Sequence, residues 1–217
     1  LFVLPAMIFA LWAQSRVNSA YETYSRMYSK SGASGYQVSA ALLRNAGLSD
    51  VRIERIEGRL SDHYDPRKRV LRLSPGIYDS PSIAAMAIAA HEVGHAVQHS
   101  VGYAPLAIRN GLVPLVQFSS NAAFPLFFIG LFMNSDPLML GILFFMGAVV
   151  FQLITLPVEY NASNRAVDML QVSGFLSSGD VQPVGNMLNA AALTYLAGTA
   201  VAIAQVLRLM LYRNRRR

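Results

Sequence analysis

Two long apolar segments, residues 112–133 and 137–156, constrain the fold of this chain most strongly. Each is long enough to cross about 30 Å of hydrocarbon, and the turn-forming residues 134–137 between them predict a tight connection. Two further apolar segments lie at residues 1–13 and 190–212. Because 53% of the residues are hydrophobic and only 14% are charged, the composition excludes an ordinary soluble domain. The sequence therefore predicts a polytopic membrane protein whose middle two segments form a transmembrane hairpin.

The polar residues gather between the first apolar segment and this hairpin, in a region long enough for one small domain. The first segment is short for a span, but it is favoured as an anchor over a cleaved signal peptide because it lacks a clear small-residue cleavage site. We expect five parts, in chain order: an anchor (1–13), the main part of the small polar domain (14–111), the hairpin (112–156), a second helical region of that domain (157–189), and a membrane helix with a basic tail (190–217).

Local patterns in the polar region predict a mainly α fold with a small β-sheet, of the α+β class. Residues 36–46 have apolar side chains near helical spacing, with Gly47 as a stop. Residues 51–56 alternate as a strand does. A β-hairpin is expected over 60–64 and 69–73, around the turn-forming residues 65–68.

The pattern His91-Glu92-Val93-Gly94-His95 closes an alanine-rich apolar run. On a helix, His91 and His95 lie one turn apart on one face, and Glu92 lies beside them. Two neutral imidazoles can hold one Zn²⁺, and a neighbouring carboxylate can take the proton of an activated water and pass it to a leaving amine. The spacing therefore predicts a zinc peptidase site with Glu92 as general base. A buried hydrogen-bond network without metal is the alternative.

The start of this helix is predicted at Ser80, as the N-cap, with Pro81 at the first helical position. We expect one helix over residues 80–99. Its many alanines make it thin, so that it packs closely against its neighbours, and polar side chains buried there need partners.

Two residues compete as the third zinc ligand. His99 lies two turns after His91 and about 80° away around the helix, and a straight helix cannot easily bring three successive turns to one tetrahedral ion. Glu159 follows the apolar segment 137–156 and returns, after the hairpin, to the side of His91. A carboxylate at the end of a membrane span needs a partner, so Glu159 is favoured. An interfacial glutamate that faces water is the alternative.

Four motifs together resemble the YugP family of membrane zinc metallopeptidases, also called neutral zinc metallopeptidase family 2. They are Asp-His-Tyr-Asp-Pro-Arg at 62–67, Val-Leu-Arg-Leu-Ser-Pro-Gly at 70–76, Ala-Ala-His-Glu-Val-Gly-His-Ala-Val-Gln at 89–98 and Leu-Pro-Val-Glu-Tyr-Asn-Ala-Ser at 156–163. The resemblance covers nearly the whole chain. It implies Zn²⁺ as cofactor and a multi-pass protein of a bacterial plasma membrane.

More distantly, a zinc-motif helix followed by a membrane hairpin and a Glu-Tyr-x-Ala helix is similar to the HtpX and CaaX prenyl protease gluzincins. That resemblance implies Glu159 as the third ligand. It also implies an edge strand beside the metal, here residues 69–73, that pairs with the substrate backbone. Those relatives carry an aspartate four residues after the glutamate, where this chain has Ser163. Any role of that aspartate falls to Ser163, to Asp168 or to neither.

Five further polar residues are candidates for a role near the predicted zinc site. His63 and Asp65 are expected to be structural, because a histidine beside a turn-forming Asp and Pro is more often structural than metal-binding. Arg165, Tyr160 and His99 are candidates for stabilising an oxyanion. The sequence does not choose among these three.

The formal net charge of +6 does not indicate nucleic acid in this chain. Four of the positive charges lie in residues 213–217, directly after the last apolar segment, where a basic cluster meets anionic lipid. If all four segments cross, this tail places the zinc site outside the cytoplasm. Basic residues beside the other ends of the spans, and the HtpX resemblance, favour a cytoplasmic site. The side stays open, as do protein partners and oligomeric state.

The sequence thus predicts a membrane-embedded zinc endopeptidase that acts on peptides, unfolded chains or membrane-protein segments. A catalytically silent, zinc-stabilised assembly partner in the membrane is the main alternative, and a fourth ligand such as His99 or His63 would favour it. A transport module is supported only by polar residues in the hairpin segments. Neither alternative accounts for Glu92.

Overall fold

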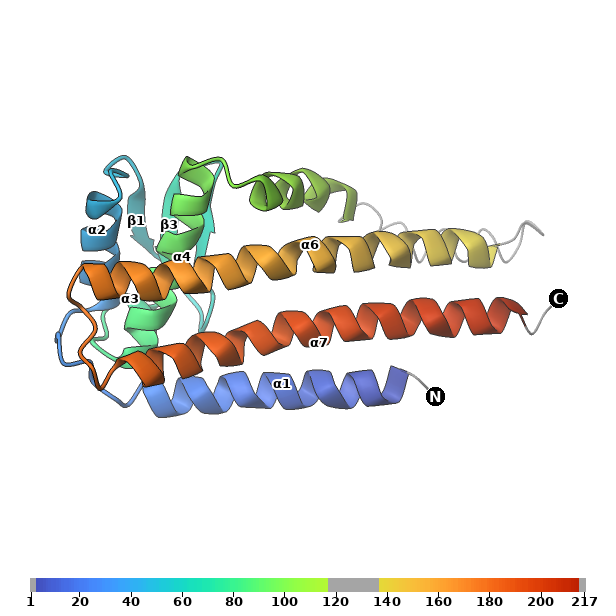
Figure 1. Cartoon of the computed structure of the whole chain (residues 1–217), viewed down its shortest axis with the longest axis horizontal. Helices are drawn as coiled ribbons and strands as arrows, with labels where there is room; N and C mark the ends of the chain where they lie inside the picture. The colour runs from blue at the N-terminus through green and yellow to red at the C-terminus, as the bar shows by residue number, and fades with distance from the viewer. Residues whose placement is uncertain (1–2, 117–136, 215–217) are drawn as a thin grey trace. The chain divides into compact units, whose positions relative to one another are not determined.

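Helices dominate the structure and a single described sheet has three strands, which confirms the α+β prediction (Figure 1). The computed structural model describes residues 3–116 and 137–214. In chain order the elements are α1 (Val3–Tyr24), α2 (Gly35–Asn45), β1 (Arg52–Arg55), β2 (His63–Asp65), β3 (Val70–Leu73), α3 (Pro75–Tyr78), α4 (Ile83–Ser100), α6 (Pro137–Val172) and α7 (Val181–Asn214). A further helix, Ala104–Val116, follows α4 in the sequence.

The chain divides into two compact units. The first includes α1 up to Gln14, α6 up to Pro157 and α7 from Leu193, and a small buried apolar cluster joins α1 to α7 within it. The second consists of Ser15–Tyr103 and Val158–Ala192. Three long helices therefore contribute to both units.

The structure supports one of the four predicted membrane spans. Within residues 3–116 and 137–214, only Val181–Leu211 of α7 is long and apolar enough to cross a bilayer, and it contains most of the expected span 190–212. Segment 137–156 is helical in α6, and segment 1–13, as far as it is described, in α1. Most of segment 112–133 and the expected turn fall outside the described residues.

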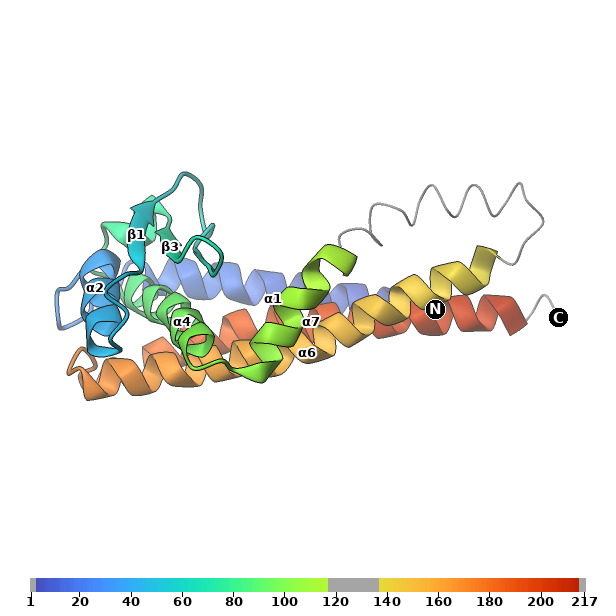
Figure 2. The ribbon, with the colours of Figure 1, turned by 90° about the horizontal axis from the view of Figure 1, so that it is seen from above.

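The second unit contains the main hydrophobic core, and α4 runs through it. A helix that is apolar on nearly all sides must be covered on all sides, and α4 is packed by α2, α3, the sheet and α6 (Figure 1, Figure 2). Leu71, Ile77 and Leu170 are among its fully buried neighbours. Burying a side chain of that size contributes about 1.5–3 kcal/mol, so this core fixes α4 firmly.

The sheet has the strand order β1-β3-β2, with β3 in the middle. β1 pairs with β3 in parallel, and β2 pairs with β3 antiparallel with Tyr64 opposite Leu71. The expectation that residues 69–73 form an edge strand is wrong, because β3 is paired on both sides. Val70, Leu71 and Leu73 are fully buried, as a central strand requires. The edge strand that contacts α4 is β2.

The hairpin turn forms where it was predicted, but the strand before it is shorter. The Asp65 carboxylate accepts the backbone N–H groups of Arg67 and Lys68 at 3.0 and 3.1 Å, the pattern of a side chain that closes a turn. The backbone of Leu60 has a φ of 55°, which is incompatible with a strand. β2 therefore begins only at His63.

The start of α4 differs from the prediction, and Ser80 is not its N-cap. The cap is Ser82, whose hydroxyl oxygen accepts the N–H of Ala85 at 3.2 Å. The segment before it is extended, because the carbonyl of Pro81 accepts the N–H of Ser29 at 2.9 Å. A pairing with a distant part of the chain has therefore overridden a good local start signal.

Gly94 brings α4 and α6 into backbone contact. A Cβ at this position would lie 2.6 Å from the carbonyl oxygen of Ala162, closer than real side chains approach. Ala162 and Ala166 are themselves fully buried. Small residues on both helices thus allow the two backbones to approach closely.

We expect Gly94→Ala to separate α4 from α6 and to lower stability by about 1–3 kcal/mol, the usual cost of overpacking. Thermal unfolding in detergent measures the change. Gly185→Ala is the matched control, because Gly185 also lies in a helix of the second unit and a Cβ there meets nothing within 4 Å. The control should be neutral or stabilising, since alanine favours helix by about 1 kcal/mol. Equal behaviour of the two variants would contradict the close approach.

Candidate metal centre

α4 places His91, Glu92 and His95 together at its middle. One ligand atom from each of the three lies within 4.8 Å of the other two. The two imidazole rings have centroids 4.7 Å apart and meet edge to face at 84°. The three side chains are buried or half-buried, so water covers little of this polar group.

Glu159 of α6 completes the cluster. Its Oε2 lies 3.2 Å from Nε2 of His91 and 3.6 Å from Nε2 of His95, and the side chain is 3% exposed. Ligands about 2.05 Å from a tetrahedral Zn²⁺ lie about 3.3 Å from one another. The two separations lie on either side of that value, so the placing of the Glu159 oxygen against each histidine fits ligands of one small cation.

Burial and the neighbouring charges shift the pKa values of Glu159 and His95 in opposite directions. Burial would raise the pKa of Glu159, but hydrogen bonds and charges from His91 and His95 outweigh it and hold that pKa well below its usual range. Burial lowers the pKa of His95, whereas its hydrogen bond to Glu159 and the charges of Glu92 and Glu159 raise it, and the net shift is upward. The cluster therefore favours an anionic Glu159 carboxylate and a positive charge next to it.

Glu92 points from the same helix toward the sheet. Its Oε2 accepts the backbone N–H of Tyr64, in the edge strand β2, at 3.0 Å. This bond holds the carboxylate beside the two histidines, within 4.8 Å of their ligand nitrogens. It also links the zinc-motif helix to the strand edge.

Ser163 contacts His91 from α6. Its hydroxyl oxygen lies 3.1 Å from Nδ1 of His91, the ring nitrogen opposite the one that faces Glu159. A partner on the second nitrogen orients an imidazole and fixes its tautomer. Of the two residues left open by the sequence, Ser163 makes this contact, whereas the Asp168 side chain is exposed.

Comparison with known proteins accounts for this arrangement. Residues 1–214 match the family described as "Putative neutral zinc metallopeptidase". The chain belongs to this zinc metallopeptidase family. It is 43% identical over 215 residues to the Bacillus subtilis (strain 168) protein described as "Putative membrane protease YugP", which covers 98% of this chain and 96% of that protein. No solved structure matches the chain.

Membership of the zinc metallopeptidase family confirms the resemblance that the four motifs carry, and it gives Zn²⁺ as the cofactor. The donors present fit this metal, because two imidazole nitrogens and a carboxylate oxygen are a common zinc ligand set. The histidines of the centre have partners on their second nitrogens, as zinc-binding histidines usually do.

The remaining candidates lie in other contacts. Half-buried His99 has its Nδ1 2.9 Å from the Tyr64 hydroxyl. His63 has its Nδ1 2.9 Å from the carbonyl of Ser61, which fits the structural role expected for it. Tyr160 is 44% exposed. These contacts do not decide which residue stabilises an oxyanion, so that role stays a prediction.

Sequence reasoning missed two polar residues, Gln98 and Asn161. Gln98 is fully buried and bonds His95, and Asn161 bonds Gln98. The available signal was the spacing, because a residue three positions after His95 lies on the same face of the helix. Arg165, predicted as an oxyanion candidate, donates from Nε to Asn161 at 2.8 Å and so belongs to this network.

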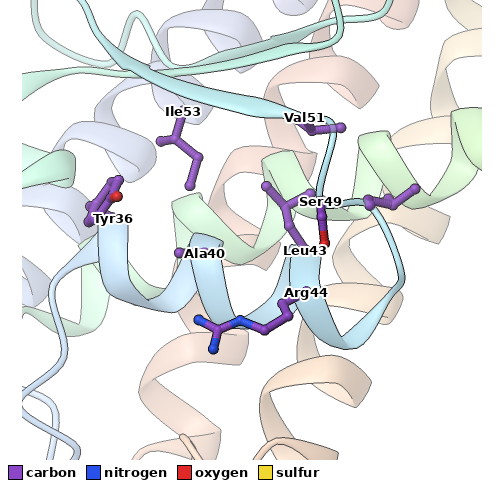
Figure 3. Close-up of a pocket in the computed structure, with 8 residues that line it drawn as sticks. Tyr36, Ala40, Leu43, Arg44, Ser49, Val51 and Ile53 are labelled. Atoms are coloured by element: carbon purple, nitrogen blue, oxygen red, sulfur yellow. The ribbon is translucent and has the colours of Figure 1, made fainter.

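A separate pocket lies between α2 and β1 (Figure 3). It encloses about 290 Å³ and is lined mainly by apolar side chains, among them Tyr36, Leu43 and Ile53, with Arg44 at its side. None of the residues of the metal centre lines it. The centre and this pocket are therefore distinct features of the second unit.

We expect Glu159→Gln to weaken zinc binding more than about 100-fold, because it removes an anionic donor, and loss of a mere hydrogen-bond partner already costs about 10- to 100-fold. Competition with a chromogenic chelator measures the affinity. Asp168→Asn is the matched control, since it neutralises an exposed acid on the same helix. If both variants bind zinc as the natural chain does, Glu159 is not a ligand.

Proposed function

We propose that this chain is a zinc-dependent endopeptidase of the gluzincin type, embedded in the membrane. The observation that carries the proposal is the meeting of His91, His95 and Glu159 around one position, with Glu92 held beside them. A carboxylate next to three ligands is what hydrolysis requires, and a purely structural centre has no use for it.

His91 and His95 would hold the metal through their Nε2 atoms, and Glu159 through its carboxylate. Three protein ligands leave a fourth position open, as in catalytic zinc sites. When bound there, Zn²⁺ supplies a Lewis acid that makes a water more acidic and polarises the peptide carbonyl.

Glu92 performs the proton transfers in this mechanism. Its carboxylate accepts a proton from the attacking water and then donates it to the nitrogen of the leaving amine. The N–H of Tyr64 holds one carboxylate oxygen, which keeps Glu92 oriented during both transfers. Because the side chain is buried, little bulk water competes for the proton.

The substrate would be an extended peptide that lies along β2. Among the described strands, this one pairs with β3 alone, and its Tyr64 N–H is hydrogen-bonded to Glu92. Pairing with a strand edge holds a peptide through its backbone and tolerates many sequences. This mode suits unfolded chains and extended segments of membrane proteins.

The apolar faces of the first unit support a multi-pass membrane location. Along α1, exposed apolar side chains recur at helical spacing at positions 4, 7, 8, 11 and 12. Along α7, they recur at positions 196, 203, 207 and 210. Contiguous apolar faces of this kind need a lipid or protein cover. We infer that segments 1–13, 112–133 and 137–156 cross the bilayer together with α7.

A silent assembly partner remains the second candidate, and it depends on a fourth protein ligand. The two histidines outside the motif are His63 and His99. In the structure they contact Ser61 and Tyr64, respectively. These contacts favour an open, catalytic centre.

Glu92→Gln should abolish cleavage of unfolded casein and of a detergent-solubilised membrane protein, because the amide cannot accept a proton. Zinc content should stay at the natural level, since the three ligands remain. Glu57→Gln, at an exposed acid of the same unit, should cleave normally. Cleavage that survives in Glu92→Gln would reject Glu92 as the base, and a natural chain that binds zinc but cleaves neither substrate would favour the silent partner.

The four-span arrangement can be mapped by labelling single cysteines, because the chain has none of its own. Cysteines placed at Glu57 and Ser178 should react from one side of sealed vesicles, and cysteines at Ser135 and Arg215 from the other. A thiol reagent that does not cross membranes distinguishes the two groups. Labelling of the Glu57→Cys and Ser135→Cys variants from the same side would contradict the hairpin.

A further inference from the structure

Gln98 is a fully buried polar side chain on α4, one turn after His95. Its Oε1 lies 3.0 Å from Nδ1 of His95. Its Nε2 lies 2.8 Å from the carbonyl oxygen of Val158 and 3.0 Å from Oδ1 of Asn161. A buried amide is costly unless its polar atoms have partners. Here the partners are a centre histidine and the two α6 residues that flank Glu159 on either side along the helix.

The orientation of the Gln98 amide follows from the hydrogen-bond chemistry of its partners. A backbone carbonyl oxygen can only accept, so the Gln98 atom that faces Val158 must be the NH₂ group. The other end of the amide, Oε1, then faces His95. An oxygen of an amide only accepts, and it requires an N–H on Nδ1 of His95.

A second, independent contact leads to the same orientation. The Nε–H of Arg165 can only donate, and it lies 2.8 Å from Asn161. The Asn161 atom at this place must therefore be Oδ1. Because that oxygen also faces Gln98, the Gln98 atom there must be a donor. Two fixed groups, one acceptor and one donor, thus determine both amides without ambiguity.

We propose that Gln98 is a positioning residue that keeps a proton on Nδ1 of His95, so that Nε2 is the nitrogen offered to a metal. Nε2 is the atom that faces Glu159. Its lone pair is what a metal ligand must offer. His91 receives an oxygen partner on the corresponding nitrogen from Ser163, so both histidines would present the same nitrogen to the metal.

The same side chain also ties the two ligand-bearing helices together. The Gln98 side chain extends from α4 and donates hydrogen bonds to Val158 and Asn161, in the turn of α6 that carries Glu159. A shift of either helix would break hydrogen bonds in a buried place, at a cost of about 1–3 kcal/mol for each unsatisfied group. Gln98 therefore positions His95 and Glu159 relative to each other. This inference rests on the proposed zinc ligation, whereas the tautomer of His95 can be observed without metal.

The direct test is the tautomer of His95 in the metal-free natural chain. Two-bond ¹H–¹⁵N spectra of protein labelled at histidine separate the two neutral tautomers, and the chain has only four histidines to assign. In the metal-free chain, Nδ1 of His95 should carry a proton, whether or not Nε2 also carries one toward the Glu159 carboxylate. A neutral ring with its proton on Nε2 alone would overturn the proposal, and this measurement needs no variant that has to fold.

Gln98→Met tests the consequence, because methionine keeps the volume and loses the amide. We expect a mixture of His95 tautomers and a 10- to 100-fold loss of zinc affinity, the usual effect of removing the partner of a metal-binding histidine. Gln171→Met is the matched control, since Gln171 is exposed on α6, and it should bind zinc as the natural chain does. Unchanged tautomer and affinity in Gln98→Met would overturn the proposal.

The outcomes separate this inference from the proposed function. If the natural chain shows the Nδ1–H tautomer but does not bind zinc, the proposed zinc site fails and the orienting role of Gln98 stands. If the natural chain binds zinc but its metal-free His95 carries a proton on Nε2 alone, the zinc site stands and the role of Gln98 fails. A variant that only loses stability, with the tautomer and the affinity of its folded fraction unchanged, counts against positioning.

Discussion

The contact between α4 and α6 at Gly94 is the constraint on which the rest of the centre depends. Glu159 can lie 3.2 Å from His91 only because no side chain separates the two backbones at Ala162. The bonds from Ser163 to His91 and from Gln98 to Val158 cross the same interface. The missing Cβ of Gly94 therefore lets the two helices approach closely enough for their polar side chains to meet in a place that excludes most water.

Burying polar and charged groups costs free energy, and hydrogen bonds to the individual groups offset that cost. In a buried carboxylate, each oxygen needs a donor or a cation, and an unpaired one would take up a proton instead. Glu159 has the two histidines, Glu92 has the N–H of Tyr64, and Gln98 has partners at both ends of its amide. One oxygen of each buried carboxylate and both ends of the Gln98 amide therefore have a partner in an apolar surrounding. That pairing leaves the three atoms around the proposed metal position with little freedom to turn away.

The accuracy of the sequence predictions follows the range of the interactions that decide each feature. The zinc-motif helix and the turn at Asp65 depend on residues a few positions apart, so their patterns are visible in the sequence. The start of α4 and the central place of β3 depend on pairing with distant segments, and local signals at Ser80 and at residues 69–73 pointed elsewhere. The place of Glu159 near the histidines was predicted from an expected hairpin that would return the chain to the same side, and from the gluzincin resemblance. The network of Gln98 could not be predicted, since nothing in a single sequence shows which buried amide meets which imidazole.

One helix carries both the apolar segment 137–156 and the proposed ligand Glu159. Only two residues, Pro157 and Val158, lie between Leu156 and Glu159. If that segment crosses the bilayer as proposed, the proposed ligand follows the end of a membrane span by three positions in the chain. A compact soluble protein would have to unfold locally to bring a peptide bond to such a place, whereas an extended segment emerging from the membrane already lies there. If the centre hydrolyses peptide bonds as proposed, the position of Glu159 on α6, rather than the chemistry, would select the substrate.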